Sequence, residues 1–214
     1  MKKLALGLVA VLAVLVLGVL GLAMTKTDTV VVERSITVDA TPADVAPFAE
    51  DLRKVVLWSP WVDKDPDLTQ TFSDPSTGVD AWYAWEGDEN VGSGKQTVTV
   101  SEPGKVTHHL HFLTPFEGEA DATLTWAQNG DAVDVTWGYT QDSTSLGGKV
   151  MQVFLDMDDM IGPDFAAGLA KLKPLAEAAA AERVAAEEAA AAEEAKRLAE
   201  TAAAQEQGEE EPAE

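Results

Sequence analysis

The amino-acid sequence predicts an α+β fold in which a curved antiparallel sheet wraps around one long C-terminal helix, preceded by a single transmembrane helix. The first observation is an uncharged apolar run over residues 4–24. The second is a series of short segments with alternating apolar and polar residues, the period of half-buried strands. The third is an apolar repeat in steps of three and four from Val150 to Leu172, which is typical of an amphipathic helix.

The N-terminus is expected to be a membrane anchor. Residues 4–24 form 21 uncharged positions, and at ~1.5 Å per residue they match a hydrocarbon core of about 30 Å. Lys2 and Lys3 favour a cytoplasmic segment over residues 1–3, which places the rest of the chain on the extracytoplasmic (periplasmic) side. A cleaved signal peptide is the alternative, with a cut after Ala23, although signal segments are usually shorter. Both alternatives export the domain.

The composition excludes some partners. A net charge of −22 argues against binding nucleic acid or an anionic lipid surface, because phosphate contacts need clustered lysine and arginine. The chain has no cysteine, so it forms no disulfide and gives no indication of the redox compartment.

The domain is expected to begin with a strand over residues 30–38. Thr41 then offers an N-cap and Pro42 a proline at the first helical position, which predicts a short helix. A second short helix is expected over residues 51–58, ending before Pro60 because the residue that precedes a proline avoids the helical region.

Six further strands are expected in the middle of the chain. They lie near residues 70–73, 81–86, 94–101, 105–112, 118–127 and 132–141. The segments between most of them contain glycine, proline, asparagine or aspartate, as hairpin turns do. In the later strands the apolar side chains share one face, so one face of the sheet is buried and the other is wet.

The C-terminal part is predicted to be helical. Gly162-Pro163 is expected to kink or split the long amphipathic helix, since proline removes a backbone donor. The composition then changes to alanine and glutamate, so residues 178–214 are expected to form a fraying helix that ends in a disordered tail.

This order of elements resembles the helix-grip superfamily called SRPBCC, over about residues 30–177. The likeness is carried by Val32-Glu33-Arg34-Ser35-Ile36, Ala40-Thr41-Pro42-Ala43-Asp44-Val45, Trp58-Ser59-Pro60-Trp61 and Gly162-Pro163-Asp164-Phe165. The superfamily includes START lipid-transfer domains and the birch-pollen allergen family. The sequence is most similar to a membrane-anchored, polyketide cyclase/dehydrase-like bacterial group. The resemblance implies a hydrophobic cavity between the sheet and the long helix, for a lipid, polyketide or other apolar ligand.

The aromatic residues are candidates for the wall of that cavity, although each of them also suits plain core packing. The expected cavity residues are Trp58, Trp61, Tyr83, Trp85, His108, Leu110, Phe112, Trp126, Trp137, Tyr139 and Phe154. The loop from Trp58 to Trp61 is expected to lie at the cavity mouth.

Histidines His108, His109 and His111 lie on one predicted strand. His108 shares the face of the buried apolar residues and is the weak candidate for a general acid–base, while a hydrogen-bonded interior histidine is the simpler interpretation. His109 and His111 share the wet face, but a zinc site needs at least a third protein ligand. We therefore expect no metal and no cofactor.

The remaining motifs favour binding over chemistry. Asp156-Met157-Asp158-Asp159 matches an acidic motif of terpene cyclases, which need large all-helical domains that this chain cannot form. No nucleophile elbow is present. The predicted function is a membrane-anchored exported domain that binds a hydrophobic small molecule or lipid. A cyclase or dehydratase enzyme and a protein-interaction module without a ligand are the alternatives, so catalysis stays open and any protein partner unknown.

Overall fold

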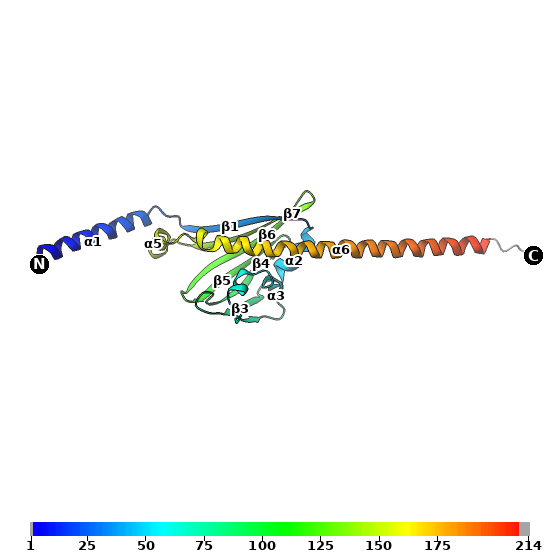
Figure 1. Cartoon of the computed structure of the whole chain (residues 1–214), viewed down its shortest axis with the longest axis horizontal. Helices are drawn as coiled ribbons and strands as arrows, with labels where there is room; N and C mark the ends of the chain where they lie inside the picture. Colours follow the sequence, from blue (N-terminus) through cyan, green and yellow to red (C-terminus); the bar gives the residue numbers. More distant parts are fainter. Residues whose placement is uncertain (1, 210–214) are drawn as a thin grey trace, which may run out of the picture.

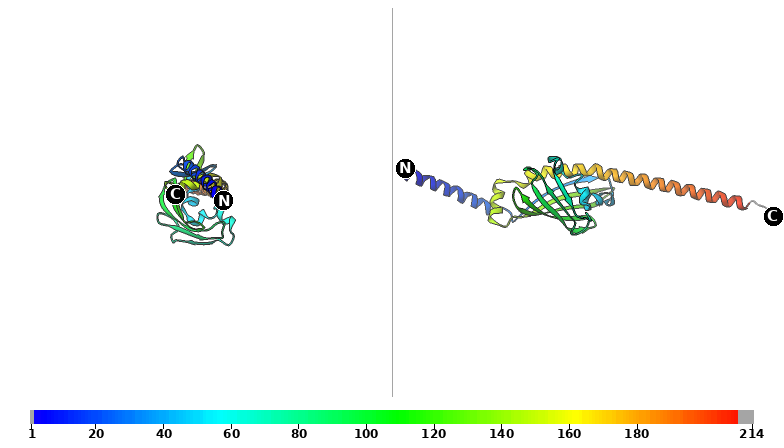
Figure 2. Two further views of the ribbon diagram at one scale, coloured as in Figure 1. Left: turned by 90° about the vertical axis from the view of Figure 1, so that its left-hand side faces the viewer. Right: turned by 90° about the horizontal axis from the view of Figure 1, so that it is seen from below.

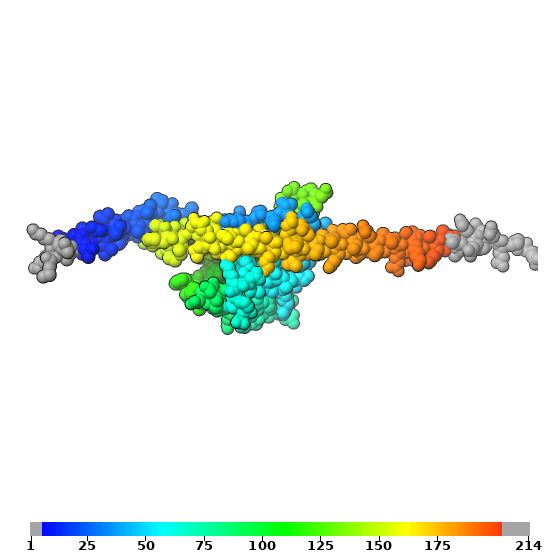
Figure 3. Space-filling view, in the orientation of Figure 1, coloured from blue at the N-terminus to red at the C-terminus, as the bar shows by residue number. Residues whose placement is uncertain are grey.

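The computed structural model describes residues 2–209 and shows an elongated molecule (Figure 1). A single sheet-and-helix domain lies between two helices that project from opposite ends. At one end, α1 (Lys2–Ala23) stands clear of the sheet, and at the other end the second half of α6 (Met157–Glu209) does the same (Figures 1 and 3). Among the described residues, α1 is the one helix long and apolar enough to cross a membrane.

The sheet has seven antiparallel strands in the order β1-β7-β6-β5-β4-β3-β2. They are β1 (Thr29–Val38), β2 (Thr69–Phe72), β3 (Trp82–Glu86), β4 (Ser93–Glu102), β5 (Lys105–Thr114), β6 (Gly118–Asn129) and β7 (Ala132–Asp142). Each predicted strand is present within a few residues of its expected bounds. The sheet curls, as its end-on view shows (Figure 2), and α6 packs along β1. The predicted α+β helix-grip fold is confirmed.

Three short helices connect β1 to β2: α2 (Pro42–Glu50), α3 (Leu52–Val55) and α4 (Pro60–Lys64). Helix α2 begins after Thr41, the predicted N-cap, and the carboxylate of Asp44 completes a capping box there: it accepts from the backbone N–H of Thr41 at 2.9 Å and from its hydroxyl at 2.8 Å. The second predicted helix is shorter than expected and stops at Val55, and α4 was not predicted.

The helical part breaks at a different place from the one predicted. A separate helix, α5 (Leu146–Phe154), precedes α6, and the chain turns at Leu155 and Asp156. There the Asp156 carboxylate accepts from the backbone N–H of Asp158 at 2.9 Å, which starts a new helix. At Pro163 α6 continues, so the predicted split of the helix at that proline is wrong. The buried residues that follow, beginning with Phe165, keep α6 on the sheet.

A cluster of aromatic rings packs α6 against the sheet in the middle of the domain. Phe165 of α6 lies flat on Trp137 of β7, with ring centroids 4.0 Å apart, and Trp58 meets the edge of Trp137 at 4.9 Å. The indole N–H of Trp58 donates to the carbonyl of Phe48 at 3.0 Å, which satisfies the one polar atom of this buried ring. This cluster fixes the distance between α6 and the sheet, and the space beyond it remains open.

Candidate ligand cavity

A cavity of about 1000 Å³ lies between the concave face of the sheet and the helices α5 and α6. Its wall includes Val31, Tyr83, Trp85, Leu110, Phe112, Ala122, Trp137 and Tyr139 from the sheet, and Met151, Leu155, Met157, Met160, Ile161 and Phe165 from the helices. Its size is at the upper end of the ~300–1,000 Å³ that ligand sites usually have. The wall is predominantly apolar, so an apolar ligand would leave water on entering.

The cavity opens at the end of the domain from which α1 projects. Wall residues that reach solvent gather there: Lys26, Thr27, Thr29, Phe116, Glu117, Asp142, Met151, Leu155, Asp156, Asp158 and Met160. They come from the segment after α1, the β5–β6 loop, the end of β7, α5 and the start of α6. We call this opening the mouth. It is far from the Trp58–Trp61 loop in the chain, and in that loop Trp58 is buried and does not line the cavity.

The structure brings most of the expected cavity residues together and leaves others outside the wall. Those along the wall are Trp61, Tyr83, Trp85, Leu110, Phe112, Trp137 and Tyr139. Trp58 and Trp126 are buried in the core, and Phe154 lies on α5 with its side chain exposed. Phe154 is exposed because the chain turns at Leu155. This turn interrupts the helical repeat from which an inward orientation of Phe154 was predicted.

The helical side of the wall was missed by sequence reasoning, although a signal for it exists. Three of the five methionines of the chain, Met151, Met157 and Met160, fall within ten residues, and all three line the cavity. Methionine side chains are flexible and adapt to ligands of different shape. A methionine cluster shared between α5 and the start of α6 therefore indicates an adaptable apolar wall.

The charged side chains of the wall gather at the mouth, and away from it the polar side chains are neutral. Gln96 of β4 and Gln141 of β7 line it, as do Tyr83 and Tyr139. Burial raises the pKa of Tyr83 and of Tyr139 to about 12, so both phenols keep their protons at neutral pH. Neutral hydroxyls and amides can orient one polar end of a ligand without offering it a charge.

His108 is buried on β5 but is not part of the cavity wall. Its register partners are Val98 on β4 and Ala122 on β6. Burial lowers the pKa of His108 to about 4, and its Nε2 atom has no hydrogen-bond partner. The imidazole is therefore neutral at pH 7, and it is not among the residues that line the cavity.

The other two histidines lie on the outer face of the sheet. The ring of His109 meets Asp121 at 3.0 Å and that of His111 meets Glu117 at 3.7 Å. Within residues 2–209 no group of three or more histidine, aspartate or glutamate side chains is arranged to hold a metal ion.

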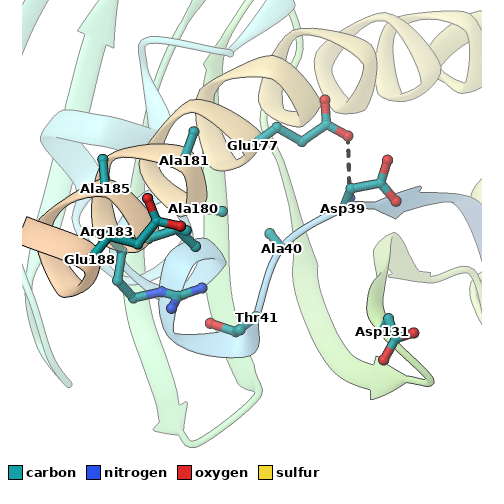
Figure 4. Close-up of a pocket in the computed structure, with 11 residues that line it drawn as sticks. Asp39, Ala40, Thr41, Asp131, Glu177, Ala180, Ala181, Arg183, Ala185 and Glu188 are labelled. Atoms are coloured by element: carbon teal, nitrogen blue, oxygen red, sulfur yellow. Dashed lines mark hydrogen bonds between the residues drawn. The ribbon is translucent and has the colours of Figure 1, made fainter. Parts of the chain in front are cut away.

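A second, shallow depression lies on the opposite side of the domain, between α6 and the turn after β1 (Figure 4). The backbone N–H of Asp39 donates to the carboxylate of Glu177 at 3.2 Å. Arg183 already pairs with Asp44 and Glu187, each at 3.0 Å. Arg183 and Glu177 of the depression are thus engaged in contacts that hold the fold together, and the depression has the character of a surface groove.

The fold and the cavity define the class of protein: a helix-grip domain that encloses an apolar cavity under its last helix. The family described as "Polyketide cyclase / dehydrase and lipid transport" matches residues 29–177, and the chain belongs to this family. The SRPBCC resemblance seen in the sequence is thereby confirmed. Among curated proteins, none matches the chain.

Several solved structures are similar to this chain at low sequence identity. One is the Mll3558 protein from Rhizobium loti, 14% identical, with a TM-score of 0.51 over 69% of this chain and 96% of that one. The protein Ms6760 from Mycobacterium smegmatis is 17% identical, with a TM-score of 0.49 over 72% of this chain and 94% of that one. The di-domain ARO/CYC StfQ from the steffimycin biosynthetic pathway is 10% identical, with a TM-score of 0.49 over 73% of this chain and 52% of that one.

Proposed function

We propose that the protein is a membrane-anchored, extracytoplasmic binding domain that holds a hydrophobic small molecule or lipid in its cavity. The observation that carries this proposal is an apolar cavity of about 1000 Å³ that opens beside α1. A ligand that buries roughly 300 Å² of apolar surface gains about 7 kcal/mol from the transfer, before the costs of association. Binding is favoured over acid–base catalysis by His108, because that side chain is not among the residues that line the cavity.

The anchor is supported by the character of α1. The residues from Leu6 to Leu17 are exposed although all are apolar and most are leucine or valine, which is stable in a bilayer and costly in water. Lys2 and Lys3 are its first two residues, and the positive-inside rule then places the domain on the far side of the membrane.

Binding is tested by native mass spectrometry of the full chain purified in mild detergent. Ala122→Phe fills the cavity from β6, and Ala127→Phe adds the same ring at an exposed position of that strand. We expect a bound apolar molecule on the wild type and on Ala127→Phe, and its loss from Ala122→Phe. An empty wild-type protein under every extraction condition would refute the proposal.

Topology is tested with a single cysteine, since the chain has none. Thr99→Cys lies at an exposed position of β4. In intact spheroplasts a membrane-impermeant maleimide should label this cysteine fully. Labelling that requires cell lysis would show the opposite orientation.

A further inference from the structure

The mouth is surrounded by large apolar side chains that face solvent. We name as the mouth rim Phe116 of the β5–β6 loop together with Leu146, Met151, Phe154, Leu155 and Met160. Phe116 is 80% exposed and Phe154 is 67% exposed. Single exposed apolar residues are ordinary on protein surfaces, but a cluster of them around one opening indicates a contact surface.

Helix α5 presents its polar side inward and much of its apolar side outward. Lys149 pairs with Asp28, and Gln152 donates to the carbonyl of Thr27 at 2.9 Å and to the hydroxyl of Ser143 at 2.8 Å. None of its residues is buried. This arrangement is the reverse of a helix on a water-soluble domain, which buries its apolar stripe. It is the arrangement of a helix that lies in a membrane interface.

The position of α5 relative to a bilayer that holds α1 follows from the contact between these two helices. The two helices pack together, and Ala23 at the end of α1 is fully buried. The 22 residues of α1 extend for about 33 Å, so the end of this helix lies at the edge of a hydrocarbon core of about 30 Å. The cavity wall begins at Lys26, three residues later, within about 11 Å along the chain.

From this geometry we infer that the mouth rim is embedded in the headgroup–acyl boundary of the bilayer that holds α1, so that the cavity opens directly to lipid. The inference rests on the proposed function in one respect, that α1 is a membrane anchor. A ligand then passes between bilayer and cavity without crossing water. The mouth carries carboxylates from Glu117, Asp142, Asp156 and Asp158. The attachment is therefore apolar, and zwitterionic lipid suits it better than anionic lipid.

The experiment places one fluorophore at a time on the full chain in phosphatidylcholine vesicles. Phe116→Cys and Phe154→Cys report on the mouth rim, and Ala127→Cys is the matched control on the exposed face of β6. Lipids with a doxyl group near the headgroup should quench both rim probes and spare the control. Aqueous iodide should quench the control several-fold more than it quenches the rim probes.

The outcomes separate the two proposals. A protein that does not float with the vesicles shows that α1 is not an anchor, which is a failure of the proposed function. Flotation with both rim probes open to iodide and insensitive to doxyl lipid overturns the rim inference alone. Rim probes shielded from iodide but insensitive to doxyl lipid would show a protein contact, such as a second copy of the chain, and would also overturn it.

Discussion

Arg34 on β1 and Asp158 in the first turn of α6 are joined by two parallel hydrogen bonds, of 2.7 and 2.9 Å. This bidentate pair lowers the pKa of Asp158, because the guanidinium stabilises its charged form. Asp158 is also a wall residue at the mouth. One helical turn later, Gly162 leaves room for the guanidinium, since a Cβ atom there would overlap it. The pair therefore fixes the start of α6 beside the opening.

Arg34→Gln is expected to loosen the mouth with little effect on the melting temperature, because solvent screens an exposed ion pair. Backbone hydrogen exchange of residues 157–161 should become several-fold faster, and release of bound ligand should accelerate with it. Lys64→Gln is the control, since Lys64 pairs with Asp164 at 2.6 Å between α4 and α6. Unchanged exchange at residues 157–161 would contradict a restraining role for Arg34.

Gly168→Ala is expected to destabilise the domain by about 1–3 kcal/mol. The added Cβ atom would lie 2.8 Å from the ring of Trp137 and 3.2 Å from Pro60, so α6 has to move off the sheet. Gly147→Ala in α5 is the matched control, because nothing lies within 4 Å of its added atom. Urea unfolding of the full chain in detergent measures both, and equal stability of the two variants would refute the close-packing argument.

Stability is expected to fall as the pH drops from 6.5 towards 4, because of His108. The unfolded chain binds a proton at the ordinary histidine pKa of 6.5, whereas burial holds the folded pKa at about 4. The unfolded state therefore takes up the proton first, and the contribution reaches about 3 kcal/mol at the bottom of that range. Unfolding curves of His108→Leu should lose this pH dependence, and those of His109→Gln should keep it. A wild-type curve that is flat from pH 7 to 5 would contradict the burial of a neutral imidazole.

Asp44→Ala is expected to cost about 1–2 kcal/mol at pH 7, since Asp44 caps α2 and pairs with Arg183 of α6. Its hydrogen bonds, first of all those from Arg183, lower the pKa of Asp44 to about 2. This stabilisation is present above pH 3.8 and is lost as the pH falls towards 2, below the range of His108. Asp131→Ala, in the exposed turn after β6, should be neutral. A cost that persists unchanged at pH 2 would argue against an ionised cap.

The strands were predictable because hairpin turns and a period of two are local properties of the sequence. The alternation of side chains along β5 correctly predicted that His108 is on the buried face of the sheet. It did not distinguish core from cavity, because both lie on the concave face. Trp58 and Trp61 show the same limit: they share one loop, yet only Trp61 reaches the cavity.

The position of the mouth was not predictable from local sequence patterns. It forms where α5, the β5–β6 loop and the segment after α1 meet, and these segments are far apart in the chain. The turn at Leu155, which orients Phe154 outward, depends on one aspartate cap at Asp156 rather than on the more conspicuous Gly162-Pro163. Proline early in a helix loses one hydrogen bond, and the burial that follows at Phe165 outweighs that loss.

Unbroken over 53 residues, α6 has a length of about 80 Å. It starts at the mouth and runs away from α1, beyond the last strand (Figures 1 and 3). With the mouth on the bilayer, Glu200 would stand up to about 65 Å above the headgroups, several times the Debye length of ~8 Å in physiological salt. The acidic far end of the helix would then be electrically independent of the membrane surface, and its height would be set by the number of residues in α6.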